Sequence, residues 1–146
     1  MFIPGRRDRE KHVQLKEIFC KRKDDDFIKR FRTPAAGCEH SNLDGSRRQD
    51  TLSKLKPGAK VRLIWDAGDS GNKTTVYLLR KGGGRELSMP DCFGRLNDKT
   101  AADVTRWLSH DNIVTSAKVI KITGGSRKNP RLGCLLELTT YPGPEE

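Results

Sequence analysis

Residues 61–95 constrain the fold of this chain more than any other stretch. Two apolar runs, VRLIW and TTVYLL, flank a polar loop of Asp, Ser, Gly and Asn, and three glycines and a short FGRL segment follow. In the first run the apolar residues alternate with polar ones, which is typical of a strand with one buried face. The stretch predicts strands at 60–66 and 74–80, with a loop at 67–73 between them that presents side chains to a ligand.

Helices and further strands are placed from the same kinds of pattern. Thr33–Pro34 permits a strand near residue 31 only at the edge of a sheet, because proline cannot donate a ladder hydrogen bond. Ser46 and Gln49 match a capping box, which predicts a helix that ends at 56–58. An amphipathic helix is expected at 98–109, and strands are expected at 86–89, 91–96, 113–123 and 131–140.

The first thirty residues differ from the rest of the chain in the pattern of their charged and apolar residues. They combine many basic residues with a run of aspartates at 24–26, and their apolar residues follow loose helical stripes. We expect a charged N-terminal extension with helical periodicity at 1–30, a folded domain at 31–141 and a short tail at 142–146. Antiparallel strands with short turns and two helices predict a mainly β, α+β domain, built as a small OB-like or SH3-like antiparallel barrel.

The charge balance indicates the partner. The chain has a formal net charge of +10, and 33% of its residues are charged. Such a surplus favours nucleic acid first and an anionic membrane surface second. The sequence has no apolar run long enough to span a bilayer, and its N-terminus is charged where a signal peptide needs an apolar core. We therefore expect a cytoplasmic protein with no membrane partner.

The cysteines and the known catalytic motifs argue against a metal site, a cofactor or an enzyme. The four cysteines are far apart in the sequence, whereas zinc ligands usually come in close pairs, so we expect reduced and mostly buried thiols. No GxSxG, Walker or HExxH motif is present. Asp66, Asp69 and Asp91 could form a metal-dependent nuclease cluster, but aspartate in a turn-rich loop usually serves backbone geometry. The sequence therefore predicts a protein with no catalytic residue, metal or cofactor.

Basic residues at element ends favour binding. Lysine and arginine in loops make the phosphate contacts of nucleic-acid-binding proteins. Two arginines in the first turn of the predicted helix at 46–56 stand at the less favourable end for cations, which indicates either a ligand or a solvated helix start. Aromatic residues are only 6% of the chain, so stacking on bases has few candidates. The candidate cations are Arg47, Arg48, Lys73, Arg95, Arg127 and Lys128, and the candidate rings are Tyr77 and Phe93.

Three stretches together resemble the HIRAN domain, a small barrel module found alone in bacteria and attached to helicase-like DNA-processing proteins. AAGCEHSNLDGSRRQDTLSKLKPGAKVRL resembles the family's first strand, helix and second strand. FGRLNDKTAADVTRWL resembles its short Gly-containing strand and the helix that follows, and AKVIKITGG resembles the next strand. The resemblance covers roughly residues 31–141.

The resemblance implies recognition of DNA, particularly of single-stranded ends. Carried over by position, it points to Glu39 and His40 after the first strand, to Asp69 and Asn72 in the loop, and to Arg95. The loop departs from the family pattern, because Gly71 stands where the family has an aromatic residue.

The sequence therefore predicts a non-catalytic module that binds nucleic acid, DNA rather than RNA, through a basic rim around the 67–73 loop. The alternative is a protein-interaction domain that uses the same face to dock an acidic protein partner.

Overall fold

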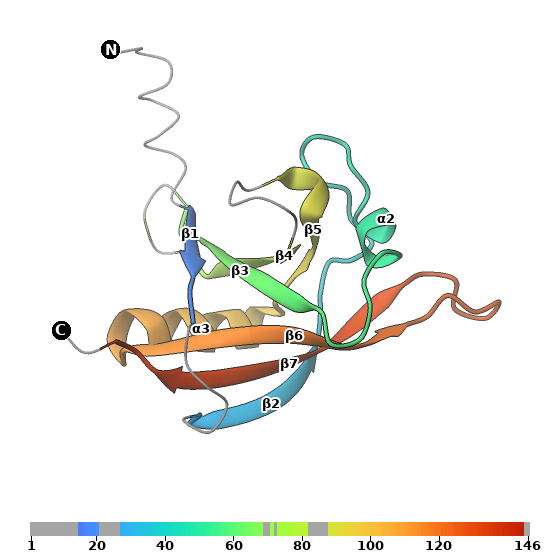
Figure 1. The fold of residues 1–146 in the computed structure, drawn as a ribbon. Helices are drawn as coiled ribbons and strands as arrows, with labels where there is room; N and C mark the ends of the chain where they lie inside the picture. The colour runs from blue at the N-terminus through green and yellow to red at the C-terminus, as the bar shows by residue number, and fades with distance from the viewer. Residues whose placement is uncertain (1–14, 21–26, 69–70, 72, 82–87, 145–146) are drawn as a thin grey trace, which may run out of the picture.

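The computed structural model describes residues 15–20, 27–68, 71, 73–81 and 88–144 (Figure 1). The secondary structure of the described part of the chain consists mainly of strands, with one long helix. The elements are β1 (Leu15–Ile18), β2 (Lys29–Pro34), α2 (Arg48–Leu52), β3 (Lys60–Asp66), β4 (Thr75–Arg80), the 3-10 turn η2 (Met89–Asp91), β5 (Cys92–Arg95), α3 (Asp98–His110), β6 (Ile113–Thr123) and β7 (Gly133–Pro142).

The strands form a mainly antiparallel sheet, which confirms the α+β class. Six strands follow the order β2-β7-β6-β3-β4-β5, and β1 pairs with β3 outside this path. The proline-containing strand β2 lies at one end of the order, as predicted for an edge strand. The sheet is not closed into the expected barrel: its end strands β2 and β5 are not paired, and among the described residues one bridge joins Arg95 of β5 to Ala36, two residues beyond β2.

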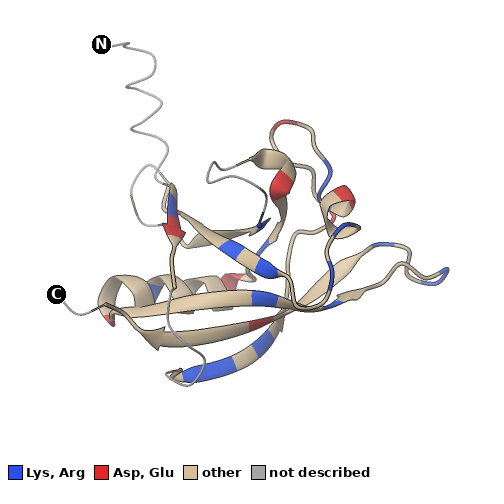
Figure 2. Cartoon of the chain, viewed as in Figure 1, with Lys and Arg blue, Asp and Glu red and all other residues tan. Residues whose placement is uncertain are grey.

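One face of the curled sheet carries the hydrophobic core. The alternation predicted for the last strand is present, since Cys134, Leu136 and Leu138 are buried while the residues between them are more exposed. The helix α3 packs against β6 and β4 (Figure 1). Its N-terminus is capped by Asn97, whose side chain accepts a hydrogen bond from the Thr100 amide at 2.9 Å. On the opposite face, charged and polar side chains predominate on β2, β7, β6 and the start of β3, and Figure 2 shows lysine and arginine on β2, β6 and β3. Farther along β3, Ile64 packs on this face with Leu79, Cys92 and Tyr77 in a second small cluster.

The N-terminal segment departs from its helical expectation. Residues 15–18 form the strand β1, antiparallel to β3, with Ile18 paired to Leu63 in the core. The reason lies in β3, which pairs with β6 only at Lys60 and Val61 and so offers the backbone groups of its later residues to another strand. Residues 29–30 likewise belong to β2, whereas 1–14 and 21–26 lie outside the described residues.

A short ion pair fastens β1 to the sheet. The carboxylate of Glu17 accepts hydrogen bonds from Nε and Nη2 of Arg62, at 3.0 and 2.6 Å. Both side chains are largely buried, with exposed fractions of 18% and 10%. This paired geometry gives β1 a fixed register on β3.

The predicted capping box does not form. The helix α2 begins at Arg48, and its N-cap residue Arg47 makes no side-chain capping bond. Ser46 Oγ donates instead to Asp44 Oδ1 at 2.5 Å, which closes a local turn. Gln49 reaches away from the helix start: its Nε2 donates to the carbonyls of Cys38 and Leu132, and its Oε1 accepts from the Leu132 amide. The side chain that would have capped the helix thus forms hydrogen bonds with two other backbone segments instead.

The predicted strand at 86–89 is also not seen as such. Residues 86 and 87 lie outside the described residues, and Met89–Asp91 forms a 3-10 turn. Pro90 in this turn cannot donate a ladder hydrogen bond, which favours a turn over a strand.

Candidate functional site

A pocket of about 290 Å³ opens between β4, β5, the start of α3 and the loop at 37–47. Thr74 and Thr75 bring the end of the β3–β4 loop to its edge, so the pocket borders the loop that the sequence singled out. It is lined by His40, Arg48, Thr74, Thr75, Tyr77, Arg95, Leu96, Asp98 and Ala101.

The wall of the pocket contains a buried cation. Arg48 is only 8% exposed. Its Nε donates to Oδ1 of Asn42 at 2.9 Å, and its Nη1 donates to the carbonyl of Gly37 at 2.8 Å. Both acceptors are neutral, and no carboxylate in the described part of the chain forms an ion pair with Arg48. A buried guanidinium with neutral partners leaves its positive charge uncompensated, so it favours an anion in the pocket.

A second arginine lies beside the first because Gly37 leaves room for both. A side chain at Gly37 would have its Cβ 3.1 Å from Arg48 Nη1 and 3.3 Å from Arg95 Nε. Gly37 also has a φ of +68°, which favours glycine on its own account. Arg95 pairs with Asp98 at 3.2 Å, but Asp98 is 99% exposed, and such a solvent-facing pair neutralises little.

Asn42 holds the wall of the pocket to the neighbouring elements. Its Nδ2 donates to the carbonyls of Met89 and Cys92, at 2.8 and 3.2 Å, and to Oγ of Ser46 at 3.1 Å. The residue is buried, and its donors and acceptor are all used. Sequence reasoning missed Asn42, because its partners Met89 and Cys92 are distant in the chain and its nearer partners Ser46 and Arg48 follow no recognisable motif with it.

Polar and aromatic groups complete the rim. Tyr77 is half buried against Ile64, Leu79 and Cys92, and burial, with a smaller contribution from the charge of Asp66, raises its pKa. Tyr77 therefore stays neutral near pH 7 and can donate or accept a hydrogen bond.

The exposed loop beside the pocket carries both signs of charge. His40 lies in this loop, with its amide donating to the Gly37 carbonyl at 3.2 Å. The pKa of the neighbouring Glu39 is lowered, first by a backbone hydrogen bond and then by His40, Arg131 and Arg95. Arg131, which the sequence analysis did not single out, therefore adds to the positive potential near the pocket.

The structure separates the residues of the predicted rim. His40, Arg48 and Arg95 line the same pocket, and Arg47 is exposed one residue before α2. Lys73 is exposed at the end of the loop, and its carbonyl accepts a hydrogen bond from Trp65 Nε1 at 2.7 Å. Asp69 and Asn72 lie outside the described residues, and Phe93 is fully buried.

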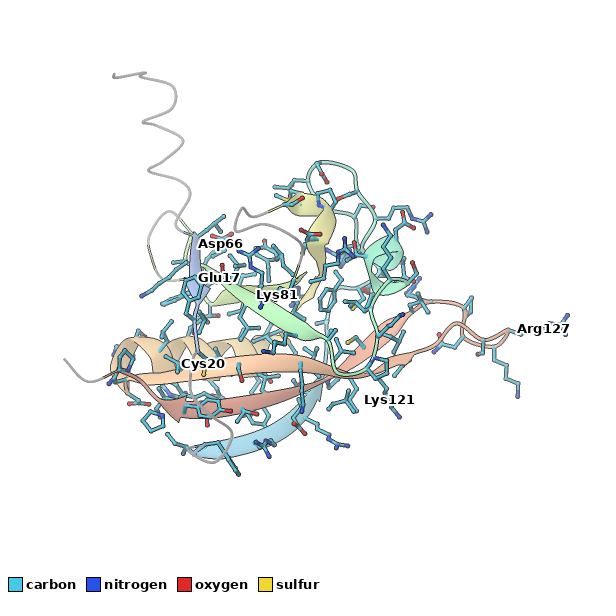
Figure 3. All side chains as sticks on the ribbon, viewed as in Figure 1. Glu17, Cys20, Asp66, Lys81, Lys121 and Arg127 are labelled. Carbon is cyan, nitrogen blue, oxygen red and sulfur yellow. The ribbon has the colours of Figure 1, made fainter. Side chains whose placement is uncertain are left out.

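The two cations of the last loop lie elsewhere. Arg127 and Lys128 stand in the connection between β6 and β7, and Figure 3 shows Arg127 at the free end of this long hairpin. The cations that the sequence grouped into one rim therefore fall at two places, the pocket and the hairpin tip.

The proposed acidic cluster does not assemble from the residues that can be placed. Asp66 accepts from the Gly68 amide at 3.0 Å, as expected of a turn aspartate, and Asp91 pairs with Arg80 at 3.1 Å. These two lie near opposite ends of β4, about 17 Å apart along the strand. Asp69 lies outside the described residues, and among the rest no group of His, Cys, Asp and Glu could hold a metal ion.

Cys38, Cys92 and Cys134 are buried and carry free thiols, and Cys20 is half buried. This agrees with the expected reduced and mostly buried thiols. Among the residues that the structure describes, no helix is long and apolar enough to cross a membrane.

Comparison of the chain with family models, with curated proteins and with solved structures finds no match. The fold and the pocket define a β-rich α+β domain with a buried, uncompensated cation at its candidate site.

Proposed function

We propose that this chain is a non-catalytic nucleic-acid-binding module, and that a DNA strand places an anionic group in the Arg48–Arg95 pocket. The observation that carries the proposal is the buried guanidinium of Arg48, which faces the pocket with neutral partners only. Such a group gains most from a phosphate, because two N–H groups of one guanidinium can donate to two phosphate oxygens.

The surroundings of the pocket support a nucleotide rather than an isolated anion. Its volume of about 290 Å³ is at the small end of ligand pockets, enough for part of one nucleotide. Tyr77 and His40 at the rim offer rings and hydrogen bonds to a base or sugar. The net charge of +10 favours the same ligand over distance.

The resemblance of residues 31–141 to the HIRAN domain supports the same ligand class and a single-stranded or end-containing DNA. The proposal extends to the architecture, because the bridge between Arg95 of β5 and Ala36, just beyond β2, resembles the seam of an incompletely closed small barrel.

A titration of fluorescently labelled oligonucleotides tests the proposal. A single strand of ten nucleotides and a duplex of the same sequence are titrated by anisotropy at two salt concentrations. Arg48→Gln and Arg95→Gln should each weaken single-strand binding at least about tenfold, since each removes a charge-assisted phosphate contact. Arg106→Gln removes an exposed arginine of α3 outside the pocket and should have little effect. Absence of binding at low salt, or equal effects of all three substitutions, would reject the proposal.

The second candidate is docking of an acidic protein partner, and one observation favours it. Leu43 is 95% exposed, and the turn that carries it is joined to exposed Met89 through the Asn42 side chain. Two exposed apolar side chains beside a basic pocket suit a protein surface. Affinity capture from a nuclease-treated extract separates the two candidates. A specific protein that is still captured after nuclease treatment would favour docking of a protein partner. A captured protein that is lost on nuclease treatment would favour nucleic-acid binding.

We also propose a cytoplasmic location, since the buried free thiols of Cys38, Cys92 and Cys134 suit a reducing compartment.

A further inference from the structure

A second basic surface lies on the polar face of the four strands β2, β7, β6 and β3. We call it the strand face. Strand alternation sends Leu136 and Leu138 of β7 into the core and Glu137 to the opposite side, together with its cross-strand neighbours. Figure 2 shows blue bands on β2, β6 and β3, with a red band on β7 between them. The strand face comprises Arg30, Arg32, Lys60, Lys118, Lys121 and Glu137; farther along the same side of β3, Arg62 is paired with Glu17 and Asp66 ends the strand.

Four of these residues form one row across the strands. Arg32 pairs with Glu137, Glu137 pairs with Lys118, and Lys118 pairs with Lys60. Neighbouring strands lie about 4.8 Å apart, so the row spans roughly 14 Å. The side chains stand on a sheet rather than on a loop, and their spacing is therefore held by the ladder of backbone hydrogen bonds.

The row contains a local conflict. Lys60 and Lys118 stand directly opposite each other, and like charges at such positions destabilise a sheet. No carboxylate in the described ranges pairs with Lys60 or Lys121. A feature that costs stability without an internal partner is a signal of function.

Glu137 orders the cations without neutralising them. Its carboxylate lies 3.6 Å from Lys118, and 3.7 Å from each of Arg30 and Arg32. Glu137 is 13% exposed, whereas Arg32 and Lys118 are 62% and 50% exposed. The negative charge therefore lies beneath the cations, and the positive groups face solvent. These contacts are longer than tight hydrogen-bonded ion pairs, so the cations can turn to an external anion.

We propose that the strand face binds the phosphate backbone of duplex DNA, as a site separate from the pocket. The about 14 Å from Arg32 to Lys60 is close to the roughly 12 Å width of the major groove, so the two ends of the row can reach phosphates of different strands. Contact with phosphates alone fits a face without base-reading loops. A membrane surface fits less well, because Ser116 and Thr139 between the cations are polar and offer nothing to insert into lipid.

The test uses a labelled duplex of twenty base pairs, titrated by anisotropy over a series of salt concentrations. The triple variant R32Q/K60Q/K118Q should lose at least about tenfold in affinity at low salt. Its slope of log affinity against log salt should fall by about 2 to 3, because each lost phosphate contact removes about 0.9. The control K54Q/K99Q/R106Q removes the same charge from exposed positions outside the strand face and should change affinity less than about threefold.

A gain-of-charge variant gives an independent reading. Glu137→Gln removes the carboxylate of the row and should tighten duplex binding about two- to fivefold, with a steeper salt dependence. Thermal melts by circular dichroism establish that each variant is folded. Equal losses in the triple variant and its control would overturn the proposal, and so would unchanged affinity in both.

Further experiments distinguish binding at the strand face from binding in the pocket and from binding to a membrane surface. With a single strand of five nucleotides, R48Q/R95Q should abolish binding while the strand-face triple variant retains it. If only the duplex binds and only the triple variant loses it, the pocket function fails and the strand face stands. If vesicles containing phosphatidylserine, rather than duplex, require the three cations, the strand face is a membrane surface and the proposal is overturned.

Discussion

The side chain of Arg48 donates from Nε to Oδ1 of Asn42 across 2.9 Å, inside the buried wall of the pocket. The choice of an amide rather than a carboxylate at residue 42 has a consequence for binding. An amide orients the guanidinium but leaves its charge in place, whereas a carboxylate would cancel it. The pocket is thus built around an arginine that the protein holds in place with hydrogen bonds but whose positive charge it does not neutralise.

Substitution of Asn42 by aspartate should separate these two roles. Asn42→Asp places a negative charge beside Arg48, so single-strand affinity should fall at least about tenfold and the salt slope should fall by about 1. Asn42→Ala loses the same donors to Met89 and Cys92 without adding charge. Anisotropy titration of both variants measures the difference, and equal affinities would show that the charge of Arg48 does not serve binding.

Gly37→Ala should lower both stability and single-strand affinity, because the new side chain adds crowding in the pocket to the strain of the backbone angle. An alanine at φ +68° costs about 1 to 2 kcal/mol, and its Cβ would crowd both arginines. Gly45→Ala is the matched control, because Gly45 has φ +88° and open space where its Cβ would stand. We expect both variants to lose stability in urea unfolding and only Gly37→Ala to lose single-strand affinity.

Gln49→Glu should destabilise the chain by about 2 to 4 kcal/mol. The amide of Gln49 donates to the carbonyls of Cys38 and Leu132, at 3.0 and 2.9 Å, and a carboxylate would leave both carbonyls facing a negative charge. Gln49→Ala removes the same bonds without the repulsion and should cost less. Urea unfolding of the three proteins gives the comparison. A Glu variant as stable as the wild type would mean that the loop at 37–41 is not held by this side chain.

Breaking the Glu17–Arg62 pair should loosen β1. Glu17→Gln leaves Arg62 largely buried without its carboxylate, so we expect a loss of about 1 to 3 kcal/mol at pH 7. The double variant E17Q/R62Q should lose less than the sum of the two single variants, and the shortfall measures the coupling. Hydrogen exchange at Leu63 and Trp65 should rise in Glu17→Gln, because these residues pair with β1 and their amides lie on the β1 side of β3, whereas the amide of Ile64 lies on the β4 side. Unchanged exchange there would show that β1 does not depend on the pair.

The buried thiols should make stability fall at high pH. Burial raises the pKa of Cys38 from 9.0 to about 11, with Glu39 adding to the effect, and burial raises that of Cys134 from 9.0 to about 12. Each raised pKa means that the folded state holds its proton longer. The contribution is therefore complete below about pH 9 and is lost as the pH rises through 11 and 12.

Urea unfolding at pH 8 and pH 10.5 measures this loss. We expect it to be on the order of 1 kcal/mol per thiol over that interval. The comparison protein is C38A/C134A, in which the difference between the two pH values should shrink. A difference as large as in the wild type would assign the effect to lysines and tyrosines.

The sequence by itself determined the parts of the molecule that depend on local periodicity. Alternation in residues 60–66 and 131–140 predicts strands, and the apolar stripe of residues 98–109 predicts a helix, because side-chain direction repeats every 2 or 3.6 residues whatever the fold. Thr33–Pro34 predicted an edge strand from the missing amide, and the surplus of cations was evident from composition.

Only the tertiary structure decided how distant residues meet. Residues 15–18 became a strand because β3 offered unpaired backbone groups, and Gln49 left its capping position because the carbonyls of Cys38 and Leu132 needed a donor. The pocket depends on Gly37 and Asn42 of one loop meeting Arg48 at the start of α2. The strand face depends on the register that sets Arg32, Glu137, Lys118 and Lys60 in one row. Hydrogen-bond partners and register are fixed by the whole sheet, so no local pattern contains them.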